Sequence, residues 1–240
     1  MQSISSSRLW QRFDEDAADL IPLLDEASVA FLQSVQAPVT ALDTGHVALD
    51  IDVFPQDNGG TQKEGVSRTY KPNVDGYAPI AAYLGREGWC LACELRPGSQ
   101  HSQKEFVYTL ERVMPRARAL THAPLLARLD SAHDAEDNRA WFRRQSGVDY
   151  LIKWNPRRQD PLYWYDLAQE KGVWRQPRPG KQVVLFSVQR QDADGNYRLV
   201  VQLSTRMSDH QGQIYLEPEI ELEGWTTSLS EAQYDDERIV

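Results

Sequence analysis

The sequence predicts an α/β protein: a mixed sheet flanked by helices, followed by a β-rich insertion. Along residues 41–155 the expected elements run strand, hairpin, helix, strand, helix, strand, which is the order of an α/β fold. Residues 156–222 have a different texture, with apolar runs such as VVLFSV and YRLVVQLS that indicate several antiparallel strands. The aromatic residues of this part, Tyr163, Trp164, Tyr165 and Trp174, are expected to belong to it as strand residues.

The composition is that of a globular protein long enough to bury a sizeable core: 240 residues, of which 41% are hydrophobic and 25% charged. No apolar run approaches the roughly 18 residues of a membrane span, and the first twenty residues lack the apolar segment of a signal peptide. Two cysteines imply no disulfide framework. We therefore expect a cytoplasmic protein without a membrane partner.

Residues 1–40 are expected to form an N-terminal helical segment. Apolar residues recur there at steps of three and four, which is the spacing of one helix face. Pro22 interrupts this stripe, so the sequence predicts two short helices that meet near residue 21. The members of the stripe are Leu9, Phe13, Ala17, Leu20, Leu24, Ala27 and Phe31.

Residues 41–155 are expected to form the core of the fold. HVALDIDVF, residues 46–54, alternates apolar residues with carboxylates and predicts a strand. Two further strands are expected to form a hairpin around Gly85–Gly88. A capping box at Ser102 and Glu105 predicts the start of a helix that ends at Pro115.

The next strand, LLARLD, ends at Asp130, and Asp134 and Gly147 are expected to cap and to end the helix that follows it. Residues 148–154 form one more strand. A helical crossover joins the strands that end at Asp52 and Asp130. Parallel neighbours joined in this way leave their carboxyl ends at one edge of the sheet, so the two aspartates are expected to meet.

The insertion, residues 156–222, is expected to return to the core at residues 223–240. The turn Asp194-Gly195-Asn196 predicts a hairpin inside the insertion. Ser230 is expected to start an acidic final helix, SEAQYDDERIV, which is cut short at Val240.

Two aspartates at neighbouring strand ends are the ligands that a two-metal site needs. Mg²⁺ prefers hard oxygen ligands, and two such ions can activate a nucleophile and stabilise the leaving oxygen of a phosphodiester. Asp50 lies two residues before Asp52 and therefore points to the same face of its strand. An aspartate at a strand end can also be a cap or turn residue, and spacing alone leaves this alternative open.

The formal net charge of −9 hides an uneven distribution of charge along the chain. Residues 138–206 hold 13 basic and 6 acidic residues, whereas residues 216–240 hold 1 basic and 8 acidic. A polyanionic partner is therefore plausible for the middle of the chain and implausible for its two ends. The alternative is a basic face that is only solvated.

Four motifs occur in order: the Asp-x-Asp strand LDIDVF, the KEG loop with GYAPI after it, the LRPG turn, and ARLDS. Together they resemble bacterial insertion-sequence transposases of the DDE type, with the best match to insertion-sequence group thirteen-eighty. The similarity covers most of the chain, from about Arg8 to Val240. Each motif alone is a weak signal, but the set in this order is a strong one.

The resemblance implies an RNase H-like catalytic core with a β-rich insertion before its last acidic residue. It implies hydrolysis of DNA at transposon ends, dependent on Mg²⁺ or Mn²⁺, followed by strand transfer into target DNA. Asp52 matches the first catalytic, metal-binding aspartate and Asp130 the second, with Asp50 as a less favoured alternative to Asp52. Where the family has Ser-Gly-aromatic after the second aspartate, this chain has Ser131-Ala132-His133.

The family's third acid, a Glu on a helix after the insertion, has no match in this chain. Alternating glutamates in YLEPEIELEG are expected on the solvent face of a strand: Glu217, Glu219, Glu221 and Glu223. The sequence therefore looks like a transposase fragment cut at both ends, and we expect little activity from it alone. The alternative is a non-catalytic remnant that binds DNA, or binds full-length transposase, as an inhibitor.

The resemblance also gives the basic residues a role as phosphate contacts on transposon-end and target DNA, close to the nucleoid. The candidates before the second aspartate are Lys63, Arg68 and Lys71. The candidates after it are Arg139, Arg143, Arg144, Lys153, Arg157, Arg158, Lys171, Arg175, Arg178 and Lys181. Trp154, Trp164 and Trp174 could stack on a base, but we expect them to be core residues.

Two other signals predict no site. Cys90 and Cys93 should face opposite sides of a strand and are expected to be packed thiols. The five histidines have no metal-ligand spacing, and His133 is expected to be a polar loop residue near Asp130. A haloacid-dehalogenase-like phosphatase also starts with a strand ending in D-x-D, but no later Lys or paired Asp fits that mechanism.

Overall fold

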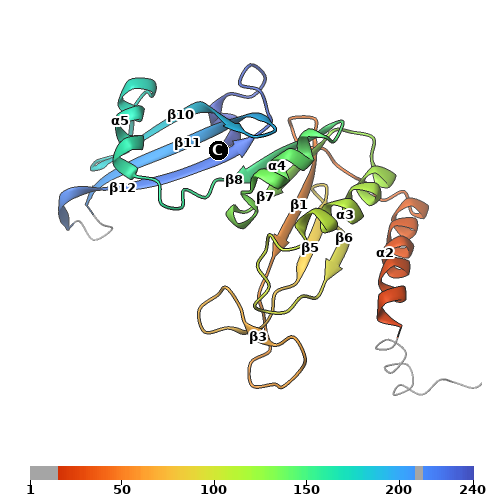
Figure 1. Ribbon diagram of the computed structural model, residues 1–240. Coiled ribbons are helices and arrows are strands. Elements are labelled where there is room, and N and C mark those ends of the chain that lie inside the picture. Colours follow the sequence, from red (N-terminus) through yellow and green to blue (C-terminus); the bar gives the residue numbers. More distant parts are fainter. Residues whose placement is uncertain (1–15, 209–212) are drawn as a thin grey trace, which may run out of the picture. The chain divides into compact units, whose positions relative to one another are not determined.

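The computed structural model describes residues 16–208 and 213–240 (Figure 1). Leu9, Phe13 and His210 lie outside the described residues. The chain forms two compact units. The first consists of the segments up to Leu49, Val53–Gln100 and Tyr108–Ala123, and the second of Asp50–Asp52, His101–Val107 and Pro124–Val240.

The first unit contains a hairpin, a small sheet and two helices. Strands β5 and β6 pair antiparallel, as the sequence predicts, and their order with β1 is β6-β5-β1. Gly85 and Gly88 have positive φ in the connecting turn, a conformation that glycine adopts without strain. The elements are α2 (Ala17–Ser34), β1 (Val47–Val53), β2 (Gln56–Asp57), β3 (Ser67–Arg68), β4 (Asp75–Tyr77), β5 (Ile80–Leu84), β6 (Trp89–Glu94) and α3 (Phe106–Leu120).

Helices α2 and α3 each contain a proline that the sequence predicts at a helix boundary. The described part of α2 is one helix with Pro22 inside it, so the prediction of two helices meeting near residue 21 is wrong. Helix α3 passes through Pro115 to Leu120. It buries Phe106 and Leu110 along with Val113 and Ala117 on one face. This packing offsets the hydrogen bond that a proline removes.

The start of α3 also differs from the expectation. Residues 102–105 form turns, and the helix begins at Phe106. Glu105 has φ of 60°, which is incompatible with the helical position that a capping box requires. The predicted capping box at Ser102 is therefore not formed.

A β-bulge in the hairpin reverses the expectation for the two cysteines. Ala82 pairs with Ala92 and Tyr83 with Cys90, so Leu91 is an extra residue on β6. Two residues on the bulged strand oppose one on its partner, which shifts the alternation by one position. Cys90 and Cys93 consequently are both exposed, and Leu91 is buried.

The second unit is built on a mixed sheet. Its strand order is Asp50–Asp52 of β1, then β7-β8-β12-β11-β10-β9. Strands β7 and β8 are parallel, and every later pair is antiparallel. The elements are β7 (Leu125–Leu129), the 3-10 turn η1 (Ser131–His133), α4 (Glu136–Arg143), β8 (Val148–Lys153), α5 (Pro161–Lys171), β9 (Arg175–Arg178), β10 (Lys181–Asp192), β11 (Gly195–Ser208), β12 (Ile214–Thr227) and α6 (Asp236–Ile239).

The central strands of this unit have one buried face and one polar face. Apolar side chains such as Ile51, Leu129 and Ile152 alternate onto the buried face, where Phe142 of α4 contacts the Tyr150 ring at 5.6 Å between centroids. Near the strand ends that carry Asp52 and Asp130, the other face, which we call the polar face, carries side chains that are half-buried or exposed. Its members used below are Asp50, Asp52, Arg128, Asp130, Leu151, Lys153, Glu223 and Trp225.

Strands β9 to β12 confirm the antiparallel strands expected for residues 156–222, but the first aromatic cluster is helical. Tyr163, Trp164 and Tyr165 lie on α5, whose start is set by the Asp160 cap and by Pro161 in the first turn. Helix α5 packs on one face of β10–β12 (Figure 1). There Trp164 is fully buried against Trp154 and Phe186.

Hairpin β10–β11 encloses the two-residue turn Ala193-Asp194, because Asp192 pairs with Gly195. After β12 the chain forms a turn, and the only helix beyond it is the short α6, capped by Asp235. Ser230 therefore does not start a helix. The segment is held by Arg198, which donates to the carbonyl of Tyr234 at 2.7 Å and to the Asp236 carboxylate. In the described part of the chain, no helix has the length and apolarity of a membrane span.

Candidate active site

Asp52 and Asp130 lie at the ends of neighbouring strands. In β1, Leu49, Ile51 and Val53 are buried, so Asp52 projects from the opposite, polar face. Asp130 directly follows β7 in extended conformation, with φ of −76° and ψ of 174°, and caps the 3-10 turn. Strand periodicity and the sheet order together place both carboxylates at one edge of the second unit.

Asp50, the alternative first acid, is engaged by an arginine. Arg128 donates from Nε and Nη2 to the two oxygens of Asp50, each at 2.6 Å. These hydrogen bonds raise the pKa of the Arg128 guanidinium further. The pair joins β1 and β7 two residues before Asp52 and Asp130. Such bidentate contacts fix the position of one strand relative to the other. Asp50 is thus placed as an arginine partner, and Asp52 is the acid at the strand end.

The electrostatics of Asp130 reflect its surroundings. Burial, and then the charge of Asp52, raise the pKa of Asp130 above its usual range. The backbone N–H of Ala132, which donates to Oδ1 at 3.2 Å, and the nearby His101 act in the opposite direction. A carboxyl whose ionised form is disfavoured by burial and by a neighbouring carboxylate marks a place where a cation is stabilised.

His133 lies close to Asp130, as expected, but it is not a surface loop residue. It is fully buried, and its ring stacks on Phe106 with 3.9 Å between centroids. Its Nε2 is 3.8 Å from Oδ1 of Asp130. The third residue after Asp130 is therefore an imidazole that packs as an aromatic ring.

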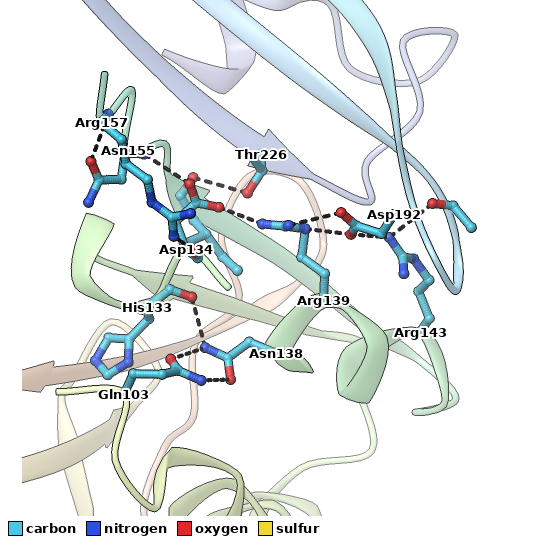
Figure 2. A network of polar contacts seen from close by, with 12 residues as sticks. Gln103, His133, Asp134, Asn138, Arg139, Arg143, Asn155, Arg157, Asp192 and Thr226 are labelled. Atoms are coloured by element: carbon cyan, nitrogen blue, oxygen red, sulfur yellow. Dashed lines mark hydrogen bonds and ion pairs between the residues drawn. The ribbon is translucent and has the colours of Figure 1, made fainter. Parts of the chain in front are cut away.

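The turn between Asp130 and α4 is held by the side-chain amides of Asn138, which is buried, and Gln103, which is half-buried (Figure 2). Nδ2 of Asn138 donates to the carbonyl of His133 at 2.8 Å and to Oε1 of Gln103 at 2.7 Å, and Nε2 of Gln103 donates back to Oδ1 of Asn138 at 2.9 Å. Asn138 is fully buried. Buried reciprocal hydrogen bonds of this kind rigidify their surroundings, so the backbone around Asp130 is positioned from two segments of the second unit.

A buried ion network continues from this turn (Figure 2). Arg139 donates from Nε and Nη2 to Asp192 at 2.7 and 3.0 Å, and from Nη1 to Asp134. Oδ2 of Asp134 accepts the backbone N–H of Asn155 at 3.0 Å. Asp134 therefore does not cap the helix; α4 begins at Glu136 after Ala135 and ends at Arg143. The network instead joins α4 to the tip of hairpin β10–β11.

The basic residues expected to contact DNA have different surroundings. In the second unit, Nη2 of Arg143 donates to Asp192 at 2.9 Å and the side chain is only 20% exposed. By contrast Arg144, Arg157 and Arg158 are exposed, although Arg157 also donates to the carbonyl of Asp134. In the first unit Lys63, Arg68 and Lys71 are exposed, and Arg68 pairs with Asp75 at 2.6 Å.

Sequence reasoning missed two contacts on the polar face. Arg128 precedes Asp130 by two residues just as Asp50 precedes Asp52, so matching period-two spacing on the two strands could have suggested their pairing. The sequence predicts Lys153 only as a phosphate contact, whereas its Nζ donates to Glu223 at 2.8 Å and lies 4.4 Å from the Trp225 ring centroid. These contacts depend on strand order, which the sequence pattern does not specify.

The β12 glutamates whose side chains the structure describes do not complete the aspartate pair. Glu221 accepts a hydrogen bond from Arg206 at 2.6 Å, and Glu223 accepts one from Lys153. The side chain of Glu217 is not described. Among residues 16–208 and 213–240, no group of three His, Cys, Asp or Glu side chains is arranged to hold a metal ion. Asp52 and Asp130 could supply two hard oxygen ligands, with further ligands from elsewhere.

The sequence of the chain matches a known protein family. The family model described as transposase DDE domain group 1 matches residues 2–172. The chain belongs to this DDE transposase family. Divalent metal ions are the usual cofactors of the family, and carboxylates paired at one sheet edge are suitable ligands for them. The expected mixed sheet flanked by helices is confirmed as the fold.

Among solved structures, the DDE transposase chain is similar to one titled "Cryo-EM structure of piggyBac transposase synaptic complex with hairpin DNA (SNHP)". The TM-score is 0.39 and the sequence identity 10%; the similarity covers 81% of this chain and 36% of that chain. The chain therefore spans about a third of the length of that transposase. No curated protein matches the chain.

Proposed function

We propose that this chain carries the catalytic core of a transposase that hydrolyses DNA at transposon ends and transfers the strand into target DNA. We further propose a bacterial insertion-sequence origin, in group thirteen-eighty, and action in the cytoplasm on nucleoid DNA. The observation that supports this best is the pair Asp52 and Asp130 at one edge of the sheet, where burial and then the charge of Asp52 raise the pKa of Asp130.

In this proposal Asp52 and Asp130 hold a divalent ion, Mg²⁺ or Mn²⁺, through their carboxylate oxygens. When bound, such ions supply activation of the attacking oxygen and stabilisation of the leaving oxygen. The chain's own contribution is positional: the N–H of Ala132 orients Oδ1 of Asp130, and the Arg128–Asp50 contact aligns the strands that carry both acids. Asp50 is a positioning residue here and not a ligand.

A third carboxylate is proposed to come from outside the described residues, because these contain no suitable third ligand. We accordingly propose that the isolated chain has little strand-transfer activity. In the proposed organisation, residues 1–40 are an N-terminal helical segment, 41–155 with 223–240 form the core, and 156–222 are the insertion. A partner copy or a full-length transposase could supply the missing acid.

DNA is the proposed partner of the exposed cations near the strand ends, Arg144, Arg157 and Arg158, with Lys63, Arg68 and Lys71 as further contacts. Arg143 is proposed to act indirectly, by holding Asp192. The lack of a third described ligand also favours a second candidate function, a non-catalytic chain that occupies DNA ends as an inhibitor. The two candidates differ in whether the aspartate pair binds metal.

Mn²⁺ binding by isothermal titration calorimetry tests this directly, because it needs no catalytic turnover. We expect weak binding to the full chain that is lost in Asp52→Asn and in Asp130→Asn. Asp149→Asn is the matched control: Asp149 lies on β8 and accepts a hydrogen bond from Ser228 at 2.7 Å. Equal Mn²⁺ binding by the wild type and Asp130→Asn would refute the catalytic proposal, and DNA binding without any Mn²⁺ binding would support the inhibitor.

A further inference from the structure

Lys153 stands next to Asp130 in the second unit. The last pair of the parallel β7–β8 ladder is Leu129 with Ile152, so Asp130 and Lys153 are the next residues on the two strands. Leu129 and Ile152 are buried, and alternation therefore directs Asp130 and Lys153 to the polar face. Neighbouring strands lie about 4.8 Å apart, which puts the lysine one strand from the candidate metal ligand.

The ammonium of Lys153 points away from Asp130, toward β12. Lys153 pairs with Trp225 in the β8–β12 ladder, and Nζ lies 4.4 Å from the indole centroid. Nζ also donates to Oε1 of Glu223 at 2.8 Å. The side chains of Lys153 and Glu223 remain 37% and 49% exposed. An ion pair in such exposure is weak and can exchange its partner.

We propose that Lys153 binds a DNA backbone phosphate beside the bond cut at Asp52 and Asp130, and that Glu223 occupies its ammonium until DNA arrives. This rests on the proposed function and adds a specific contact to it. The four-carbon stem lets the ammonium turn from Glu223 toward Asp130 without a backbone change. Glu223 then acts as an internal competitor of DNA, since a phosphate and a carboxylate seek the same cation.

A second ion pair, between Arg206 on β11 and Glu221 on β12, provides an internal control. Arg206 donates to Glu221 at 2.6 Å, and the exposures of these side chains are 24% and 40%. Glu221 lies on the same face of β12 as Glu223, two residues further from Trp225. Removing its charge changes the net charge equally but leaves Lys153 paired.

The test measures the affinity of the full chain for a fluorescent DNA duplex, using fluorescence anisotropy at several salt concentrations. We expect Lys153→Gln to weaken binding about 3- to 10-fold and to reduce the magnitude of the log–log salt slope by about 0.9, the value for one phosphate contact. Lys153→Arg should restore both. Glu223→Gln should strengthen binding by a similar factor, and clearly more than Glu221→Gln, while Arg206→Gln has a smaller effect than Lys153→Gln.

A merely structural Lys153–Glu223 pair gives a different result, because Lys153→Gln and Glu223→Gln then change DNA affinity in the same direction and by similar amounts. That outcome overturns the inference. If the wild type binds DNA and Lys153→Gln binds it equally well, the inference fails while the proposed function stands. If the wild type binds no DNA, both fail.

A methylphosphonate scan locates the contact. Each phosphate of the duplex is replaced in turn by a neutral methylphosphonate, and wild type is compared with Lys153→Gln. At one phosphate the difference between the two proteins should vanish, because the contact is already lost there. A difference that persists at every position contradicts a specific phosphate contact.

Discussion

Replacing Arg139 tests the buried network most directly. Arg139→Met keeps a long side chain over the Tyr197 ring, which lies 4.5 Å from the guanidinium carbon, and removes only the charge and its hydrogen bonds. The side chains of Arg139, Asp134 and Asp192 are 8%, 7% and 7% exposed. The substitution therefore leaves two nearly buried carboxylates without their main cation.

The expected loss of stability depends on the hydrogen bonds that the two carboxylates keep in Arg139→Met. Asp192 keeps Nη2 of Arg143 at 2.9 Å, and Asp134 keeps the N–H of Asn155 at 3.0 Å, so neither carboxylate is abandoned completely. Breaking a buried ion pair on one side costs about 3–5 kcal/mol. For a chain of this size we expect the midpoint of thermal unfolding to fall by roughly 10 °C.

The assay is urea unfolding followed by tryptophan fluorescence and by circular dichroism. Arg144→Met is the matched control, because Arg144 follows α4, is 64% exposed and lies 3.9 Å from Asp194; we expect less than about 0.5 kcal/mol. Combining Arg139→Met with Asp134→Asn and Asp192→Asn should recover much of the loss, since no uncompensated charge remains. A loss below about 1 kcal/mol in Arg139→Met would refute this reasoning.

Asp130→Asn should raise the midpoint of thermal unfolding at pH 7.5. Burial and the charge of Asp52 raise the pKa of Asp130, so its ionised carboxylate destabilises the folded protein. The gain in midpoint should shrink as the pH falls through the folded-state pKa, and an equal gain at all pH values would contradict this reasoning. Cys90 and Cys93 should both react with a thiol reagent in the folded chain, since both are exposed. The reaction at pH 8 should be slower than that of a free thiol, because partial burial raises the pKa of each cysteine. A chain whose thiols react only after unfolding would contradict this prediction.

The network also adds a pH dependence to stability. Burial alone would raise the pKa of Asp192, but hydrogen bonds from Arg139 and Arg143 outweigh it and hold this pKa below its usual range. A carboxyl with a lowered folded-state pKa stabilises the fold above its unfolded pKa, and this stability is lost as the pH falls through the folded value. Arg139→Met removes the main cause of the lowering, so the stability advantage of the wild type over Arg139→Met, measured by urea unfolding across the acid range, should shrink as the pH falls through the folded-state pKa of Asp192.

The sequence by itself determined the strands that carry the candidate acids. Alternation in residues 46–54 and the apolar run before Asp130 are local patterns, and they place Asp52 and Asp130 at strand ends without knowledge of any partner. The hairpin around Gly85 and Gly88 is equally local, because glycine adopts the required turn conformation.

Only the tertiary structure decided what these residues contact. Trp164 lies on a helix because its indole is buried against Trp154 and Phe186, and this gain overrides the β preference of an aromatic run. Asp134 joins Arg139, five residues further along the chain, instead of capping α4. Asp50 joins Arg128 because strand pairing brings that cation within reach. Period-two spacing on two strands can suggest such a pairing, but only the strand order decides it. The same limit applies to Lys153, whose place beside Asp130 depends on the β7–β8 ladder.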